Sequence, residues 1–352
     1  MQIHLLTGFL GGGKTTAVQH AAQYLANHKI RTGIITNDQG SKLVDGGFFK
    51  YLDIPNREVI NGCFCCNYRE LNATITSLAA IEGAEVIFAE SVGSCTDIVA
   101  TVLKPLLKFR EDAQVTVSTF VDARLLLMML RDDTMAFDAS VRYIYFKQLE
   151  EACVIIINKV DLINDAQIAF LKETVEERYG NKVCLFQNSN DEADIKEWLN
   201  VLDNYETGPT IASLNIDYDV YAAGEAKLAW VDHAIEVFSV DGNAMQEAAF
   251  IIRDIFEAVK KKKYMFGHLK FLINNSIKIS YTSPADQPIL IDFQPSGSTN
   301  LLINMRVQTI PENITKLIAG VIAKTERQTG CKIATVSLSA FQPGYPIPEY
   351  RM

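Results

Sequence analysis

Short apolar runs alternate with longer amphipathic segments from residue 1 to about residue 203. The runs cover residues 3–6, 33–36, 86–89, 115–121, 154–157 and 183–186. Between them, the segments 15–28, 164–179 and 191–202 are polar on one face, and Asn164 and Asp191 stand where helix N-caps are expected. Buried strands that alternate with helical crossovers are typical of a parallel sheet. We therefore predict an α/β domain over residues 1–203.

The pattern changes after residue 203. Residues 204–227 carry glycine and proline and show no sustained period, which predicts a linker. The segments that follow are strand-like at 234–240, 269–274, 277–282, 289–293, 301–307 and 333–338, and helical at 244–261 and 314–329. Strands clustered between helices predict a smaller α+β domain with a largely antiparallel sheet over residues 228–352. The proline-rich segment 341–348 is expected to pack on its own domain.

Composition narrows the class of protein. A chain of 352 residues suits two domains, and 48% hydrophobic with 21% charged residues is typical of a globular protein. The 33 Lys and Arg against 42 Asp and Glu leave a net charge of −9, which argues against binding to nucleic acid or an anionic membrane. No apolar run approaches the roughly 18 residues of a membrane span, and the N-terminal residues make a poor signal peptide. We expect a cytoplasmic protein.

A glycine-rich motif directly follows the first predicted strand. Residues 8–15, GFLGGGKT, match G-x-x-x-x-G-K-[ST] and precede a predicted helix, whereas a glycine-rich turn without a role would not require this context. Backbone N–H groups of such a loop surround phosphates, Lys14 neutralises phosphate oxygens and the Thr15 hydroxyl binds Mg²⁺. The predicted nucleotide-binding residues are Gly8, Gly11, Gly12, Gly13, Lys14, Thr15 and Thr16.

A second motif selects the base. Residues 158–161, NKVD, follow the predicted strand 154–157. A carboxylate at Asp161 can accept hydrogen bonds from two N–H groups of guanine, and adenine offers no such pair. Because hydrogen bonds to charged groups contribute about 1.5 to 3 kcal/mol each, GTP is favoured over ATP. Asn158, Lys159 and Asp161 are therefore predicted to bind GTP, and the competing interpretation is a helix cap before Leu162.

Two acidic residues follow other predicted strands. Glu90 ends the strand 86–89, where a P-loop enzyme needs a carboxylate to orient Mg²⁺ and its water; a cap for the next helix is the alternative. Asp38 follows the second strand and is placed to sense the γ-phosphate. With Lys14 these are the predicted catalytic residues. No residue is identified as the group that activates water, so we expect slow GTP hydrolysis unless a partner contributes.

Cys63, Cys65 and Cys66 lie within four positions. Seven cysteines is an odd number, and this clustering suits metal chemistry better than a disulfide framework. Three thiolates can converge on Zn²⁺ and leave its fourth position open. A redox dithiol and buried structural cysteines are the alternatives. The remaining cysteines are expected to be small buried apolar residues: Cys95, Cys153, Cys184 and Cys331.

Taken together, GFLGGGKTT, GCFCC, the acid at Glu90 before Gly93, and NKVD resemble the CobW/UreG/HypB family of P-loop GTPases, most closely its CobW-like branch. The resemblance covers residues 1–203. Residues 36–47 are similar to that branch's switch loop, although Asp38-Gln39 stands where an acid followed by an aromatic residue is usual. The second domain resembles the C-terminal domain of CobW-like proteins mainly in its position in the chain and in its α+β pattern. The histidine-rich stretch of several relatives is absent, which argues against a metal store.

The resemblance implies GTP-dependent delivery of zinc, cobalt or nickel to target proteins, with Cys63, Cys65 and Cys66 as the metal site between nucleotide switch elements. We therefore predict a metallochaperone that uses GTP and Mg²⁺ and carries Zn²⁺, or Co²⁺ or Ni²⁺, to a client metalloenzyme. The fourth ligand and homodimer formation are left open. One alternative is a GTPase chaperone for a corrinoid-dependent or other cofactor-dependent enzyme, with structural cysteines. Another alternative is a metabolic kinase, and the preference for guanine expected from Asp161 argues against it.

Overall fold

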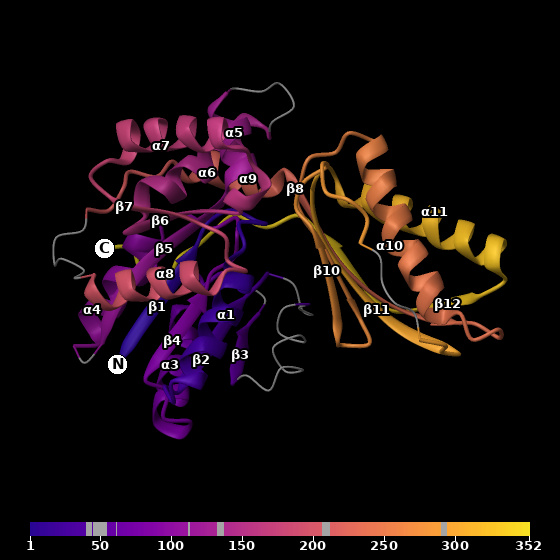
Figure 1. The fold of residues 1–352 in the computed structure, drawn as a ribbon, viewed down its shortest axis with the longest axis horizontal. Coiled ribbons are helices and arrows are strands. Elements are labelled where there is room, and N and C mark those ends of the chain that lie inside the picture. The colour runs from indigo at the N-terminus through magenta and orange to yellow at the C-terminus, as the bar shows by residue number, and fades with distance from the viewer. Residues whose placement is uncertain are drawn as a thin grey trace. The chain divides into compact units, whose positions relative to one another are not determined.

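The computed structural model describes residues 1–39, 44, 55–60, 62–111, 113–131, 137–205, 212–289 and 294–352. The chain divides into two compact units (Figure 1). Unit 1 comprises Met1–Gln39, Asp53–Gly224 and Tyr345–Met352, and unit 2 comprises Gly40–Leu52 and Glu225–Gly344. No helix in these described ranges is both long enough and apolar enough to cross a membrane.

Unit 1 is built on a parallel sheet. Its described strands are β1 (Gln2–Thr7), β2 (Thr32–Asn37), β3 (Asn56–Val59), β4 (Val86–Glu90), β5 (Gln114–Asp122), β6 (Val154–Asn158) and β7 (Val183–Gln187). They are ordered β3-β2-β4-β1-β5-β6-β7, and every neighbouring pair is parallel. The connecting helices are α1 (Lys14–Asn27), α3 (Tyr68–Ile81), α4 (Lys104–Phe109), α5 (Ala123–Leu130), α6 (Ala139–Glu151), α7 (Asp165–Tyr179), α8 (Glu192–Asn204) and α9 (Tyr218–Ala226), with short turns η1 (Val99–Leu103) and η2 (Val160–Leu162). The predicted α/β class is confirmed.

The central strands are largely buried, as expected for a parallel sheet whose two faces are covered by helices. Every residue of β4 and of β6 is buried. The predicted caps are also confirmed: Asn164 forms a capping box with Gln167 at the start of α7, and the Asp191 carboxylate accepts from the Ala193 N–H at the start of α8. Strand β3 was not predicted, because only Val59 of its four residues is fully buried and no apolar run marks it.

Two parts of the chain differ from the sequence-based expectation. Helix α9 lies inside the range 204–227, for which we predicted an irregular linker, and the division between the units falls within this helix. Residues 345–352 cluster with unit 1, whereas we expected the proline-rich segment 341–348 to pack on the second domain. Hydrogen bonds to Cys65 and Asp97, both in unit 1, hold residues 345–352 there.

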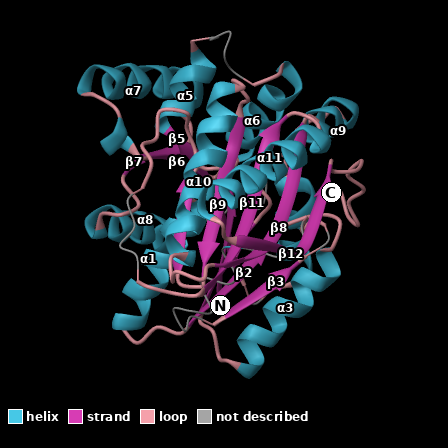
Figure 2. Cartoon of the chain, turned by 90° about the vertical axis from the view of Figure 1, so that its right-hand side faces the viewer, coloured by secondary structure: helices cyan, strands magenta, loops and turns pink. Residues whose placement is uncertain are grey.

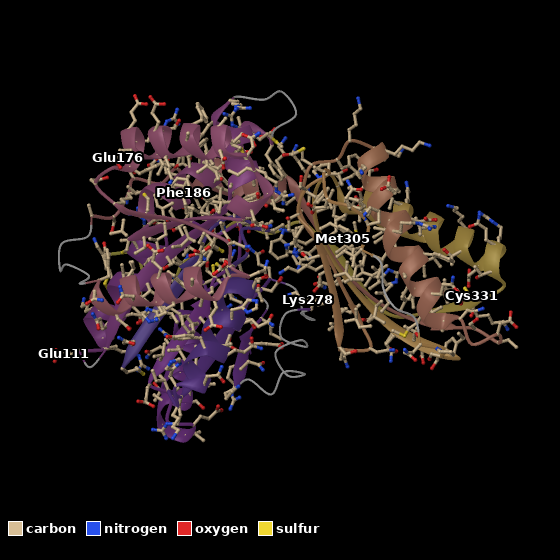
Figure 3. All side chains as sticks on the ribbon, viewed as in Figure 1. Glu111, Glu176, Phe186, Lys278, Met305 and Cys331 are labelled. Carbon is tan, nitrogen blue, oxygen red and sulfur yellow. The ribbon has the colours of Figure 1, made fainter. Side chains whose placement is uncertain are left out.

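Unit 2 is an antiparallel sheet with two helices. Its described strands are β8 (Leu228–Phe238), β9 (Phe266–Ile273), β10 (Ile277–Tyr281), β11 (Ser298–Gln308) and β12 (Lys332–Phe341), ordered β10-β9-β11-β8-β12. Helices α10 (Ala244–Lys261) and α11 (Pro311–Thr329) lie side by side on one face of this sheet (Figures 1 and 2). Met305 on β11 and Cys331, just before β12, belong to the hydrophobic core between this sheet and the two helices (Figure 3). The predicted α+β class is confirmed, and most of the predicted strand 289–293 lies outside the described residues.

One buried ion pair lies within the sheet of unit 2. Arg306 is fully buried, its guanidinium donates to the Asp232 carboxylate at 2.9 Å, and it stacks 4.0 Å from the Trp230 ring centre. Asn304 donates to the same carboxylate oxygen, and its amide oxygen accepts the backbone N–H of Val44 at 2.9 Å. This hydrogen bond connects Val44, which follows β2 in the sequence, with strand β11 of unit 2.

Buried His4 on β1 predicts a pH dependence of stability. Burial lowers the pKa of His4 from 6.5 to about 4. Below pH 6.5 the unfolded chain therefore binds a proton that the folded chain excludes until about pH 4, so the free energy of unfolding falls as the pH decreases through this range. The loss attributable to His4 approaches about 3 kcal/mol.

We expect His4→Gln to remove this contribution, measured by urea unfolding at steps between pH 7 and pH 4. The exposed His28 provides the control variant His28→Gln, which should keep the wild-type slope. Equal slopes for His4→Gln and wild type would contradict the assignment.

Candidate nucleotide and metal site

The parallel register brings the ends of several strands to one edge of the sheet. Leu6 of β1 and Thr36 of β2 are each paired with Glu90 of β4, and Asp122 of β5 is paired with Asn158 of β6. Loops that leave these carboxyl ends therefore begin side by side. Ligands of open α/β sheets bind at this edge.

The glycine-rich loop connects β1 to α1 and needs glycine for steric reasons. Gly8 has a φ of +114°, and a Cβ added to it would lie 2.0 Å from the carbonyl oxygen of Phe120 on β5. Gly13 has a φ of +93°, and its added Cβ would lie 2.2 Å from the amide nitrogen of Asn158. The loop is thus packed against both β5 and the NKVD motif. Among the described residues, no side chain caps the N-terminus of α1.

Lys14, Thr15 and Glu90 come together at the start of α1. The Lys14 Nζ donates to the Gly8 carbonyl at 2.6 Å, so its ammonium lies across the loop. The Thr15 hydroxyl donates to both carboxylate oxygens of Glu90 at 3.0 Å. A hydroxyl and a carboxylate are hard oxygen donors of the type that Mg²⁺ prefers, so this pair fits a magnesium site.

The NKVD motif is attached to the glycine-rich loop. The Asn158 amide donates to the Gly12 carbonyl at 2.9 Å, and the Lys159 Nζ donates to the Gly11 carbonyl at 2.7 Å. The amide oxygen of Asn158 accepts from the N–H and the hydroxyl of Ser189, which follows β7. Asp161 lies in η2 and is exposed to solvent. An exposed carboxylate in this motif is accessible to a base.

Two polar residues of this edge were not identified from the sequence. Asp122, at the end of β5, accepts from the Lys159 Nζ at 2.9 Å and from Arg124. Burial raises the pKa of Asp122, but the positive charges of Lys159 and Arg124 outweigh it and hold that pKa below its usual value. Ser189 is the other. Each lies at or just beyond the carboxyl end of a strand of the parallel sheet, and that position was the available signal.

The cysteine turn, residues 62–66, is attached to the end of β2 by Asn37. The Asn37 amide nitrogen donates to the carbonyls of Val59 and Gly62, and its oxygen accepts the Phe64 N–H at 2.9 Å. Within the turn, the Cys66 N–H donates to the Cys63 carbonyl at 3.0 Å, which brings the two side chains to the same side. Asn37 lies one residue before Asp38, so the turn and the predicted γ-phosphate sensor share one strand end.

The three thiols of this turn converge. The Cys63 sulfur lies 2.7 Å from that of Cys65 and 3.2 Å from that of Cys66, and the Cys65 and Cys66 sulfurs are 3.8 Å apart. Hydrogen bonds with Cys65 and Cys66 hold the pKa of Cys63 well below the usual range of a thiol, whereas the bond with Cys63 raises the pKa of Cys66 to about 11. One thiolate is therefore stabilised by the others. These groups form a set that can hold one metal ion.

Cys95 lies against the same cluster, although we expected only a small buried apolar residue there. It is 2% exposed and its thiol hydrogen-bonds with the Cys63 sulfur. Cys153 and Cys331 are buried as expected, while Cys184 is partly exposed.

The segment Tyr345–Met352 returns to unit 1 and contacts the cysteine turn. The Glu349 N–H donates to the Cys65 carbonyl at 2.9 Å, and the Tyr350 ring packs on that of Tyr68 at 5.2 Å. Arg351 donates to the buried Asp97 carboxylate at 2.7 Å. This segment therefore connects the cysteine turn with the loop that carries Cys95.

Thr16 and Asp38 are also predicted site residues, and their contacts do not test the roles predicted for them. Thr16 is on the first turn of α1, and Asp38 follows β2, where its N–H donates to the Val59 carbonyl at 3.2 Å. Of the segment 36–47 that is similar to a switch loop, residues 40–43 and 45–47 lie outside the described residues. The roles assigned to these residues stay predictions.

A glycine-rich loop between the first strand and first helix of a parallel sheet, attached to an NKVD loop, defines a P-loop nucleoside-triphosphatase fold. Consistent with this class, the profile of the CobW/HypB/UreG nucleotide-binding domain matches residues 2–185, more than half of the chain. The protein belongs to the CobW/HypB/UreG family. The family resemblance inferred from the motifs is thus confirmed.

Distant relatives carry zinc-related names. The chain is 27% identical over 210 residues to the zinc chaperone CobW of Sinorhizobium sp, covering 53% of this chain and 59% of that one. It is 27% identical over 231 residues to zinc-regulated GTPase metalloprotein activator 1 of Dictyostelium discoideum, covering 57% and 48%. With the zinc chaperone YjiA of Escherichia coli it shares 33% over 96 residues, covering 27% and 30%. The matches thus span less than two thirds of these relatives.

Replacing Asn37 should loosen the cysteine turn. Asn37→Ala removes three hydrogen bonds and leaves the buried Phe64 N–H without its acceptor, at a cost of about 1 to 3 kcal/mol. Because a mobile turn must be ordered before it can bind, we expect Zn²⁺ affinity to fall about tenfold. Competition with a chromophoric chelator measures this affinity.

The control is Asn313→Ala, at an exposed position of α11 in unit 2. It should leave Zn²⁺ affinity unchanged. Wild-type affinity in Asn37→Ala would show that the turn does not need this attachment.

Proposed function

We propose that this protein is a GTP-dependent metallochaperone that binds Zn²⁺ through Cys63, Cys65 and Cys66 and delivers it to a client protein. The observation that carries the proposal is the convergence of three thiols in a turn that Asn37 attaches to the edge of the sheet where the glycine-rich loop begins. Soft sulfur donors and a triphosphate loop at one edge suit a protein that binds metal in one nucleotide state and releases it in another.

In this proposal residues 8–16 surround the phosphates of GTP. The backbone N–H groups and Lys14 neutralise phosphate charge, and Asp161 accepts from the N–H groups of guanine. Asn158 and Lys159 position both loops through the Gly11 and Gly12 carbonyls. Thr15 and Glu90 would hold Mg²⁺, which supplies positive charge to the phosphate oxygens.

The nucleotide state is proposed to reach the cysteines through Glu90 and Asp38. The carboxylate of Glu90 already contacts Thr15, so a metal at Thr15 must reorganise this hydrogen bond. Asp38 leaves the same strand end as Asn37, which supports the cysteine turn. We assign no water-activating residue, so hydrolysis is expected to be slow until a partner completes the site.

The relatives named zinc chaperones support Zn²⁺ as cargo ahead of Co²⁺ or Ni²⁺. The relative named a metalloprotein activator supports a metalloenzyme as client.

The central experiment measures Zn²⁺ affinity with GDP and with a non-hydrolysable GTP analogue. Because allosteric coupling is typically 1 to 3 kcal/mol, we expect the affinities to differ by about 5-fold to 150-fold. Replacing Cys63, Cys65 and Cys66 together by serine should abolish tight binding in both states. Equal affinities in the wild type would remove the coupling and favour the alternative of a GTPase chaperone with structural cysteines.

Asp161 provides a test of the base. An amide at this position donates where the carboxylate accepts, so Asp161→Asn should reject guanine and accept xanthine, which carries a carbonyl in place of the amino group. We expect GTP affinity to fall at least tenfold and affinity for xanthosine triphosphate to rise, measured by calorimetry. Asp165→Asn, in the first turn of α7, is the control. Unchanged GTP affinity in Asp161→Asn would exclude this mode of recognition.

A further inference from the structure

Asp122 is a buried carboxylate to which the proposed function gives no role. It is the last residue of strand β5, its side chain is 4% exposed, and it is paired in the sheet with Asn158, the first residue of the NKVD motif. A carboxylate buried to this extent acts on its neighbours in the protein. Its partners therefore indicate what it does.

Two cations bind this carboxylate. The Lys159 Nζ donates to its Oδ2 at 2.9 Å, and the Arg124 guanidinium donates to Oδ2 at 2.8 Å and to Oδ1 at 3.1 Å. The side chains of Lys159 and Arg124 are 20% and 18% exposed, so solvent screens these charges only in part. Hydrogen bonds between charged groups are about twice as strong as those between neutral groups. The charge of Asp122 is thus what holds Lys159 in place.

Lys159 connects this carboxylate with the glycine-rich loop. Its Nζ also donates to the Gly11 carbonyl at 2.7 Å. Lys159 directly precedes η2, the turn that carries Asp161. Its backbone has a φ of +63° and a ψ of +38°, a left-handed conformation that is unfavourable for a residue with a side chain. Such a conformation persists only where surrounding contacts hold it, and the bonds of the ammonium to Asp122 and Gly11 are contacts of this kind.

A helix cap is the other role that Asp122 plays. Its carboxylate accepts the Arg124 N–H at 2.9 Å, at the start of α5. A cap requires only a hydrogen-bond acceptor, and Asn or Ser supplies one as well as Asp does. Holding an ammonium in place requires a negative charge. Neutral residues that still cap the helix therefore separate the two roles.

We infer that Asp122 is a positioning residue for nucleotide binding: its charge holds the Lys159 ammonium on the Gly11 carbonyl and thereby fixes the start of η2 relative to the glycine-rich loop. The inference rests on the GTP binding proposed above. When Asp122 loses its charge, Lys159 and Arg124 are left as like charges on one oxygen and repel each other. Lys159 then leaves the Gly11 carbonyl, and the connection that remains between the NKVD motif and the glycine-rich loop is the one made by Asn158.

The test measures the dissociation of a fluorescent GDP analogue from the full-length protein by stopped flow. Asp122→Asn and Asp122→Ser keep an acceptor for the α5 cap, and Lys159→Met removes the ammonium. The double variant combines Asp122→Asn with Lys159→Met. The control is Asp254→Asn on α10 in unit 2, because Asp254 also accepts from an arginine and a lysine, Arg253 and Lys324. Circular dichroism verifies the folding of each variant.

We expect GDP to dissociate about tenfold faster from Asp122→Asn, Asp122→Ser and Lys159→Met, and at the wild-type rate from Asp254→Asn. Because Asp122 acts through the ammonium, the double variant should release GDP no faster than Lys159→Met alone. Two independent effects would instead multiply to about a hundredfold. The ratio of GTP affinity to ATP affinity should fall in the same variants, since η2 carries Asp161.

A wild-type rate in Lys159→Met or in the folded Asp122 variants would overturn the positioning role while GTP binding stands. A double variant in which the two effects multiply would do the same, because Asp122 would then act independently of the ammonium. A wild type that binds neither GDP nor GTP would overturn the proposed function itself.

Discussion

All neighbouring strands in the sheet of unit 1 run parallel, and this places their carboxyl ends at one edge. Strand β1 lies between β4 and β5, so the loop after β1 has the Glu90 loop on one side and Asp122 on the other. An antiparallel arrangement would send alternate loops to the opposite edge. The encounter of a glycine-rich loop, an acid, an NKVD motif and a cysteine turn therefore depends on strand direction.

Hydrogen bonds at this edge join groups with different chemistry. Thr15 binds the Glu90 carboxylate, Asn158 and Lys159 bind the glycine-rich loop, and Asn37 binds the cysteine turn. Each of these contacts joins two segments that are separate in the sequence, so movement of one segment requires a response in its neighbour. A coupling of 1 to 3 kcal/mol, about the net contribution of one or two such hydrogen bonds, is enough for a useful switch.

The parts of the fold that were predictable are those with local signals. Buried strands, the Asn164 and Asp191 caps and the contiguous motifs at residues 8–15 and 158–161 follow from periodicity and spacing. Strand β3 and helix α9 lack such a signal, because one is half exposed and the other lies among turn-forming residues.

The parts of the site that were not predictable depend on contacts between segments far apart in the sequence. Cys95 has no neighbouring cysteine in the chain, so only the approach of the β4 loop to the cysteine turn reveals its contact with Cys63. Ser189 and Asp122 become neighbours of the NKVD motif for the same reason. The return of Arg351 to Asp97 depends on the whole fold, and no local pattern marks it.

The central claim is that nucleotide state and the cysteine turn are physically coupled, and amide hydrogen exchange tests it most directly. Exchange would be followed in metal-free protein for peptides covering residues 8–16 and 62–68, with GDP and with a non-hydrolysable GTP analogue. We predict that the cysteine turn, whose Phe64 N–H is bonded to Asn37, exchanges at clearly different rates in the two states. Identical exchange in this turn, with the glycine-rich loop protected by both nucleotides, would contradict the account.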